Sequence, residues 1–115
     1  MTTDTLIGCE RGGVYRIDLG TPRGHEQRGR RLGIVMSPSY MSWSVATVIP
    51  TSTSAQQTIF RPLLTLAGRE TVILTDQIRS IDTDYILGPA ITHLTRDQMR
   101  EVEYCLTRYL GLVPD

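Results

Sequence analysis

One short segment gathers most of the side chains that could perform proton transfer and bind phosphate. Residues Gly24 to Arg31 hold an imidazole (His25), a carboxylate (Glu26), an amide and three guanidiniums. Metal-free RNA cleavage needs a base for the ribose 2′-OH, a cation for the phosphorane charge and an acid for the leaving 5′-oxygen. His25 or Glu26 could transfer the proton while an arginine carries the charge. The alternative is a solvated loop whose Arg and Glu side chains neutralise one another.

The charge distribution favours a local anion site. The 115-residue chain has 12 basic residues, all of them arginine, and 12 acidic residues, so its formal net charge is zero. The positive excess of the first half lies mostly in Arg23, Arg28, Arg30 and Arg31, and Glu26 is the only acidic residue in this stretch. The planar guanidinium fork fits phosphate well. We therefore expect one anion-attracting loop and not a nucleic-acid-coating surface.

Two further polar groups allow a structural and a functional interpretation. The four hydroxyls of Thr51 to Ser54 can cap a turn or hydrogen-bond a phosphate. Asp76, Gln77 and Arg79 follow a buried-looking strand, where Asp76 and Arg79 would most often form a structural ion pair.

No metal or other cofactor is expected. The histidines are far apart in the sequence and the two cysteines lie at opposite ends of the chain, without metal-ligand spacing. We expect two reduced thiols at Cys9 and Cys105, as is usual in a cytoplasm.

Strand signals dominate the chain before its last segment. Residues 13–19 alternate, with Val14, Ile17 and Leu19 as the apolar set and Tyr15 among the residues between them. Further strands are predicted at 32–36, 44–49, 58–66, 70–77 and 86–94, and residues 78–82 either continue the fifth strand or bend away. Ala67 to Arg69 predicts a hairpin turn, and residues 20–30 predict a functional or mobile loop.

The last segment predicts a helix. Thr95 and Gln98 match a capping box, apolar side chains then recur at helical spacing, and Gly111 stands where the helix should end. Five or six short strands and one terminal helix predict a mainly β fold, a small curved antiparallel barrel with the helix packed on it. We expect a flexible tail at 1–10 and a single domain at 11–115. No apolar run is long enough for a membrane span, no export signal is present, and a cytoplasmic location is expected.

The chain resembles the MazF/PemK/Kid family of toxin ribonucleases over residues 11–112. The resemblance lies in an ordered set of segments, none decisive alone: Arg11 to Tyr15 with Asp18-Leu19, Gly24 to Gln27 followed by Arg31, Ile34 to Pro38, Val48 to Ser52, Asp76 to Asp82, and the final helix.

The resemblance implies an SH3-like, CcdB-type barrel that works as a homodimer. It also implies metal-independent, sequence-selective cleavage of single-stranded RNA to 2′,3′-cyclic phosphate and 5′-hydroxyl ends. The implied partner is a cognate antitoxin, for which we expect an acidic, partly disordered segment laid into the RNA groove. The alternative is a non-catalytic CcdB-like or SH3-like module that binds a protein on the same barrel.

Four residues match catalytic positions of the family. Arg31 takes the place of the catalytic arginine, Ser52 that of the MazF threonine, His25 that of the Kid-type histidine and Asp76 that of the Kid aspartate. Residues expected to contact RNA are Gly24, Glu26, Gln27, Arg28, Arg30, Thr53, Gln77 and Arg79. Three features depart from the family pattern, and one of them is Arg30, which neighbours Arg31 and could share its role.

Leu32 stands where a proline usually follows the catalytic arginine, so we expect a looser chain beside Arg31. Leu74 stands where Kid carries an arginine two residues before its aspartate, so a Kid-type Arg–Asp pair is incomplete.

Overall fold

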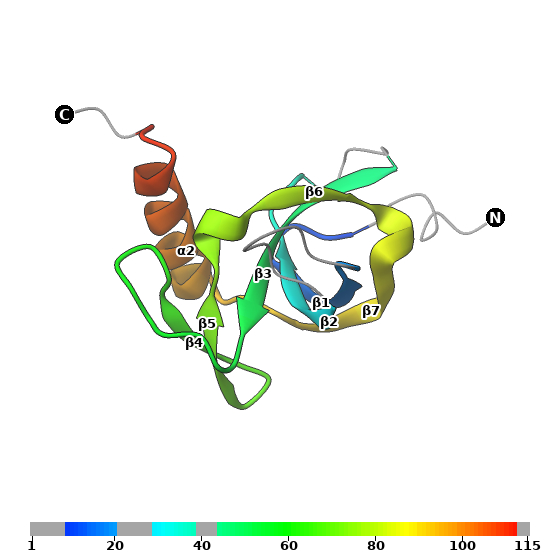
Figure 1. Cartoon of the computed structure of the whole chain (residues 1–115), viewed down its shortest axis with the longest axis horizontal. Helices are drawn as coiled ribbons and strands as arrows, with labels where there is room; N and C mark the ends of the chain where they lie inside the picture. The colour runs from blue at the N-terminus through cyan, green and yellow to red at the C-terminus, as the bar shows by residue number, and fades with distance from the viewer. Residues whose placement is uncertain (1–8, 21–28, 39–43, 113–115) are drawn as a thin grey trace.

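The computed structural model describes residues 9–20, 29–38 and 44–112 (Figure 1). Its strands are β1 (Gly13–Asp18), β2 (Arg30–Val35), β3 (Val45–Ser52), β4 (Leu63–Leu66), β5 (Arg69–Ile73), β6 (Arg79–Asp82) and β7 (Ile86–His93). Two 3-10 turns cover Thr75–Gln77 and Thr83–Tyr85, and one α-helix, α2, covers Arg96–Tyr109.

The strands form one antiparallel sheet in the order β4-β5-β3-β2-β1-β7, with β6 also paired to β3. β3 is central: its first half pairs with β6, and Thr51 and Ser52 at its end pair with β5. Figure 1 shows the sheet curling so that β6 and β7 surround β1 and β2, while α2 lies beside β4 and β5. The predicted fold class, a small curved antiparallel β structure with a C-terminal helix, is confirmed.

The sheet buries both of its faces. One buried cluster lies beneath α2 and consists of Val14, Ile34, Met36, Ile49, Leu64, Leu66, Ile73 and Val102. The other fills the inside of the curl and consists of Tyr15, Ile17, Leu19, Val35, Val48 and Ile81. Because β2 and β3 contribute to both clusters, their middle residues are held from two sides.

The predicted first strand is confirmed as Gly13–Asp18, and its alternation is irregular at Tyr15. Tyr15 is only 6% exposed and belongs with Ile17 and Leu19 inside the curl, whereas Val14 faces the helix. The Tyr15 hydroxyl accepts a hydrogen bond from the backbone N–H of Glu10 at 2.9 Å, so its polar end is satisfied. The strand therefore has two buried faces at its start, which a single-face alternation does not describe.

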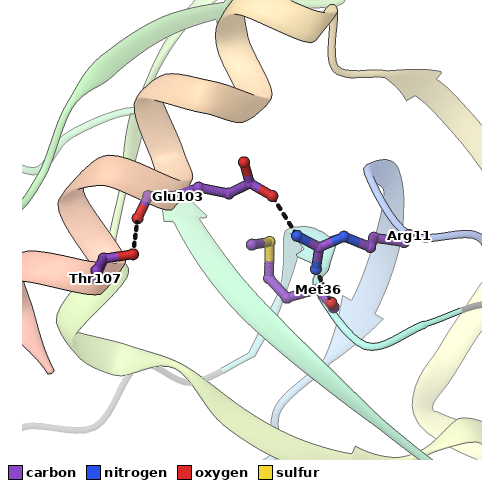
Figure 2. A network of polar contacts seen from close by, with 4 residues as sticks. All are labelled: Arg11, Met36, Glu103 and Thr107. Atoms are coloured by element: carbon purple, nitrogen blue, oxygen red, sulfur yellow. Dashed lines mark hydrogen bonds and ion pairs between the residues drawn. The ribbon is translucent and has the colours of Figure 1, made fainter. Parts of the chain in front are cut away.

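The helix is fixed at its start and along its length. The Thr95 hydroxyl accepts the Gln98 N–H, and the Gln98 side chain accepts the Thr95 N–H, so the predicted capping box is confirmed. Figure 2 shows the Arg11 guanidinium donating both to the Met36 carbonyl and to the Glu103 carboxylate. This bridge ties α2 to the start of β1 and the end of β2.

Two predicted strands are shorter than expected. In the 58–66 stretch only Leu63–Leu66 is a strand, because Thr58 and Arg61 exchange backbone hydrogen bonds across a tight turn. The 70–77 strand ends at Ile73 because Leu74, at ψ 68°, leaves the extended conformation.

The predicted hairpin turn between β4 and β5 is confirmed. Ala67 and Gly68 both have positive φ, 50° and 79°, as a two-residue type I′ turn requires.

Cys9 and Cys105 are free thiols, in agreement with the prediction. Burial raises the pKa of each thiol. Within the described ranges, no three His, Cys, Asp or Glu side chains gather as metal ligands would. None of the helices in the described part is long and apolar enough to span a bilayer.

Replacing Thr95 by alanine should remove the cap and lower the free energy of unfolding by about 1 kcal/mol. Thr95→Ser keeps the accepting oxygen and is the matched control. Urea unfolding of the three proteins measures the difference. Equal stability of the alanine and serine variants would contradict the capping role.

Candidate active site

A pocket of about 330 Å³ opens beside the C-terminal end of β3. It is lined by Arg30, Arg31, Leu32, Thr51, Ser52, Thr53, Ser54, Leu66, Arg69 and Thr71. These described lining residues include three guanidiniums and five hydroxyls but no carboxylate. Such a lining favours a phosphate or another anion.

The pocket opens where the ladder between β2 and β3 ends. Gly33 and Pro50 are the last pair in register, and no backbone pairing joins Leu32 to Thr51 beyond it. Side chains then satisfy the backbone beyond it: Arg31 Nη1 donates to the Thr51 carbonyl at 2.7 Å, and Thr51 Oγ1 donates to the Leu32 carbonyl at 2.8 Å. These two bonds hold the Arg31 side chain against β3.

The looser chain expected at Leu32 stays a prediction, and the structure shows how Leu32 is paired. Leu32 lies within β2, opposite Arg16 of β1, and its carbonyl accepts the Thr51 hydroxyl. Strand pairing and this hydrogen bond therefore help to hold the backbone that carries Arg31.

The structure distinguishes the two neighbouring arginines. Arg31 is partly buried, and this burial lowers the pKa of its guanidinium, which nevertheless stays protonated at neutral pH. A partly desolvated cation interacts more strongly with an anion than one in water. The Arg30 side chain is 79% exposed, and its Nε lies 3.8 Å from an Asp18 carboxylate oxygen. Arg31 is the fixed cation of the pocket, and Arg30 lies at its rim.

The Ser52 hydroxyl is oriented as a donor. Its oxygen accepts the backbone N–H groups of Ala55 at 2.9 Å and Ser54 at 3.1 Å. Since both acceptor positions are occupied, the remaining function of the group is to donate its proton. It can donate to Ser54 Oγ, 3.3 Å away, or to an anion in the pocket. The expected turn role of this hydroxyl and its phosphate role are thus compatible.

Asp76 does not line this pocket. It lies in the 3-10 turn after β5, where Arg61 Nε donates to Oδ1 at 2.7 Å and Nη2 to Oδ2 at 2.6 Å. These bonds lower the pKa of Asp76 and raise the pKa of Arg61, and Gln77 adds a weaker hydrogen bond to the carboxylate. The predicted Asp76–Arg79 pair is wrong, because the chain folds Arg61 against the carboxylate instead. Leu74 stands where Kid carries an arginine and has no guanidinium to offer. Arg61 supplies one to Asp76 from another part of the chain.

The other expected RNA contacts are divided among different places. Thr53 lines the pocket with Arg30, whereas Gln77 lies beside Asp76. Arg79 lies in β6 and lines a second pocket of about 330 Å³, with Asp18, Leu19, Gly20, Ser80, Ile81, Asp82 and Tyr85. The remaining expected site residues, Gly24, His25, Glu26, Gln27 and Arg28, lie outside the described residues.

Arg69 is a lining residue that the sequence analysis missed. It follows the hairpin turn, and only the pairing of β5 with the end of β3 brings it to the pocket. The turn at Ala67 and Gly68 could be recognised from sequence, but the neighbour of that hairpin could not.

Comparison with known proteins identifies the family. Residues 10–110 match the model of the PemK-like, MazF-like toxins of type II toxin–antitoxin systems. The chain belongs to this family. A curated relative of this toxin, named "Putative toxin Rv3098A/RVBD_3098A", comes from Mycobacterium tuberculosis. It is 56% identical over 103 residues, which cover 89% of this chain and 97% of the relative.

Solved structures of MazF toxins share the fold. MazF from Deinococcus radiodurans superposes with a TM-score of 0.79 at 27% identity, over 89% of this chain and 96% of that one. A mycobacterial endoribonuclease, solved in complex with its cognate antitoxin, gives a TM-score of 0.75 at 19% identity, over 92% and 98% of the chains. The resemblance seen in the sequence is thus confirmed.

Asp76→Asn should lower the free energy of unfolding by about 2 kcal/mol at pH 7, because Arg61 loses its charged partner. The folded-state pKa of Asp76 lies below the unfolded value near 3.9, so this stabilisation is fully present above that value. It is lost as the pH falls through the folded-state pKa, and the two proteins should then converge in stability.

Chemical unfolding between pH 2 and pH 7 measures this difference. Asp84→Asn, at an exposed residue, is the control and should change little. A stability gap that does not depend on pH would contradict the ion-pair explanation.

Proposed function

We propose that this toxin is a metal-independent endoribonuclease acting on single-stranded RNA. The ribose 2′-OH attacks the adjacent phosphorus, and the 5′-oxygen leaves, giving a 2′,3′-cyclic phosphate and a 5′-hydroxyl. The observation that carries the proposal is the pocket that combines Arg31, held by the Thr51 carbonyl, with the donor hydroxyl of Ser52. The name of the mycobacterial neighbour as an endoribonuclease supports it.

Arg31 and Ser52 stabilise the charge that develops on the phosphorane. Arg31 is the fixed cation and a candidate proton donor to the leaving oxygen, and Ser52 donates a hydrogen bond to a non-bridging oxygen. Such fixed donors contribute most in partly desolvated sites, typically about 3 kcal/mol each. A single strand can turn its 2′-OH into line with the leaving oxygen, which an A-form duplex resists.

His25 and Glu26 are the proposed proton-transfer groups. Backbone bonds from Leu19 N–H to the Gly29 carbonyl and from Gly29 N–H to the Gly20 carbonyl close the ends of the segment that carries them. The segment therefore leaves and re-enters the sheet next to Arg30. His25 is the proposed base or acid, and Glu26, Gln27 and their neighbours contact the RNA.

Asp76 has a positioning role in this proposal. Its partner Arg61 belongs to the stretch that connects Ser52 to β4, so the ion pair fixes the path of the chain after the pocket. The carboxylate itself is already engaged by two guanidinium nitrogens and its pKa is lowered, which makes it a poor proton acceptor.

The proposed assembly is a cytoplasmic homodimer whose two pockets flank an RNA groove. The cognate antitoxin, by this proposal, lays an acidic, partly disordered segment against the same arginines and competes with phosphate. The crystal structure of MazE–MazF from Deinococcus radiodurans, a neighbour of this fold, supports an antitoxin as the partner.

Incubation with a random pool of single-stranded RNA in EDTA tests the proposed reaction. End-group analysis should find 2′,3′-cyclic phosphates and 5′-hydroxyls at the new ends, and sequencing of the ends gives the recognition motif. Intact RNA across the whole pool would overturn the proposal and favour the CcdB-like or SH3-like binding module.

Arg31→Ala should slow cleavage about a hundredfold, since about 3 kcal/mol of transition-state stabilisation is lost. Single-turnover rates on one cleaved oligonucleotide measure the effect, and Arg100→Ala on the exposed side of α2 is the control. A thermal unfolding curve checks that the fold persists. Near-normal cleavage by the alanine variant would remove Arg31 from the mechanism.

The His25 role predicts a pH dependence. If His25 transfers a proton, the single-turnover rate should titrate between about pH 5 and pH 8. His25→Asn should flatten that profile as well as lower the rate. An unchanged profile in the asparagine variant would reduce His25 to a binding residue.

A further inference from the structure

We propose that Arg69 binds the phosphate next to the scissile one, so that the pocket takes two consecutive phosphates of one RNA strand. The inference rests on the proposed function, which places the scissile phosphate between Arg31 and Ser52. It adds a binding residue from a different part of the chain, the β4–β5 hairpin. Four observations on Arg69 and its surroundings support it.

The backbone of Arg69 is held in place. Arg69 is the first residue of β5, opposite Leu66 across the two-residue turn, and its carbonyl accepts the Thr71 hydroxyl at 2.9 Å. Three residues further on, Val72 pairs with Ser52 of β3. The hairpin is therefore in register with the strand that carries the donor hydroxyl, and Arg69 projects from a fixed position.

The guanidinium of Arg69 is available to a ligand. It is exposed at the pocket, and within the described ranges it makes no ion pair with a carboxylate. This contrasts with Arg61, which is engaged by Asp76. An arginine that lines a pocket without a carboxylate partner is suited to bind an anionic ligand.

The charges of the pocket favour more than one phosphate. Arg30, Arg31 and Arg69 place three positive charges on one pocket, and among the described residues the nearest ion-pair partner of these guanidiniums is Asp18, 3.8 Å from Arg30 and outside the lining. Like charges held near each other cost free energy, and bound anions relieve that cost. A phosphate held by Arg31 and Ser52 neutralises only part of this charge.

The size and shape of the pocket also favour two bound phosphates. Its volume of about 330 Å³ is larger than one phosphate group needs. Arg31 and Arg69 come from different strands, β2 and β5, on either side of the end of β3. Every nucleotide of a single strand carries a phosphate, so the neighbouring phosphate is the anion that a bound substrate always brings.

Binding of a non-cleavable probe tests the inference without cleavage. We would use random-sequence single-stranded oligonucleotides with 2′-fluorine on every ribose, which cannot attack the phosphate, and measure Kd at several salt concentrations. Arg69→Gln should weaken binding about tenfold and make the slope of log K against log salt less negative by about 0.7, the value for one phosphate of a single strand. Arg69→Lys keeps the charge and should keep the slope. Arg100→Gln is the matched surface control.

Neutral methylphosphonates locate the contact. For this experiment the 2′-fluoro probe has the one sequence that the wild-type protein cleaves, and replacing the phosphate beside the scissile one should weaken its binding to the wild-type protein. In Arg69→Gln the same replacement should have no further effect, whereas replacements elsewhere should affect both proteins equally. Additive losses at both neighbouring phosphates, or an unchanged salt slope, would overturn the inference.

Kinetics separate this inference from the proposed reaction. On a cleavable oligonucleotide, Arg69→Gln should raise KM about tenfold and change kcat little, the pattern of lost uniform binding, whereas Arg31→Ala lowers kcat. A wild-type protein that binds the probe through Arg69 but cuts no RNA would overturn the reaction and leave the phosphate contact. Cleavage with an unchanged KM in Arg69→Gln would overturn the phosphate contact and leave the proposed reaction.

Discussion

The end of the β2–β3 ladder after the Gly33–Pro50 pair is the constraint on which the pocket depends. A strand pair that continued past Gly33 would have joined Leu32 to Thr51 by backbone bonds and closed the space between β2 and β3. At Pro50 the ladder stops, and the next carbonyls on each strand accept from side chains instead. The Arg31 guanidinium is drawn inward to satisfy one of them. An arginine at an intact sheet edge would extend into solvent, as Arg30 does.

Such a gap is tolerated because the surrounding strands are held from both faces. Ile34 and Ile49 pack beneath α2, while Val35 and Val48 pack inside the curl, so β2 and β3 are fixed immediately before they diverge. The outer edge of β3 stays paired with β5 where its inner edge is open. The pocket is therefore a local interruption in a well-packed sheet, which suits a site that must hold a cation in one orientation.

The features that sequence could predict are those set by near neighbours along the chain. The capping box at Thr95 and the turn at Ala67 and Gly68 depend on a few consecutive residues, and both form as expected. The alternation of the first strand is irregular at Tyr15, because a strand with two buried faces does not follow a simple pattern of apolar and polar residues. The Asp76–Arg79 pairing was wrong because nearness in sequence was taken for nearness in space.

The site was predictable to the extent that the family resemblance located it. Arg31, Ser52, Arg30 and Thr53 do line one pocket, but nothing in their sequence pattern shows that Arg69 joins them. That information lies in the sheet order. β5 pairs with the end of β3, although a long connection after Ser52 separates the two strands in the sequence. Non-local pairing of this kind is the part of a β fold that local patterns do not encode.

The two ends of β5 keep opposite charges apart. Arg69 begins the strand at the pocket, and Asp76 follows its far end, where Arg61 holds the carboxylate. The five residues of the strand are four steps of about 3.3 Å, so its two ends lie about 13 Å apart. A carboxylate placed among Arg30, Arg31 and Arg69 would compete with phosphate for the same guanidiniums, as the acidic antitoxin segment is proposed to do. Because Arg61 holds Asp76 away from the pocket, this carboxylate does not compete there with the phosphate or with the antitoxin segment of the proposed function.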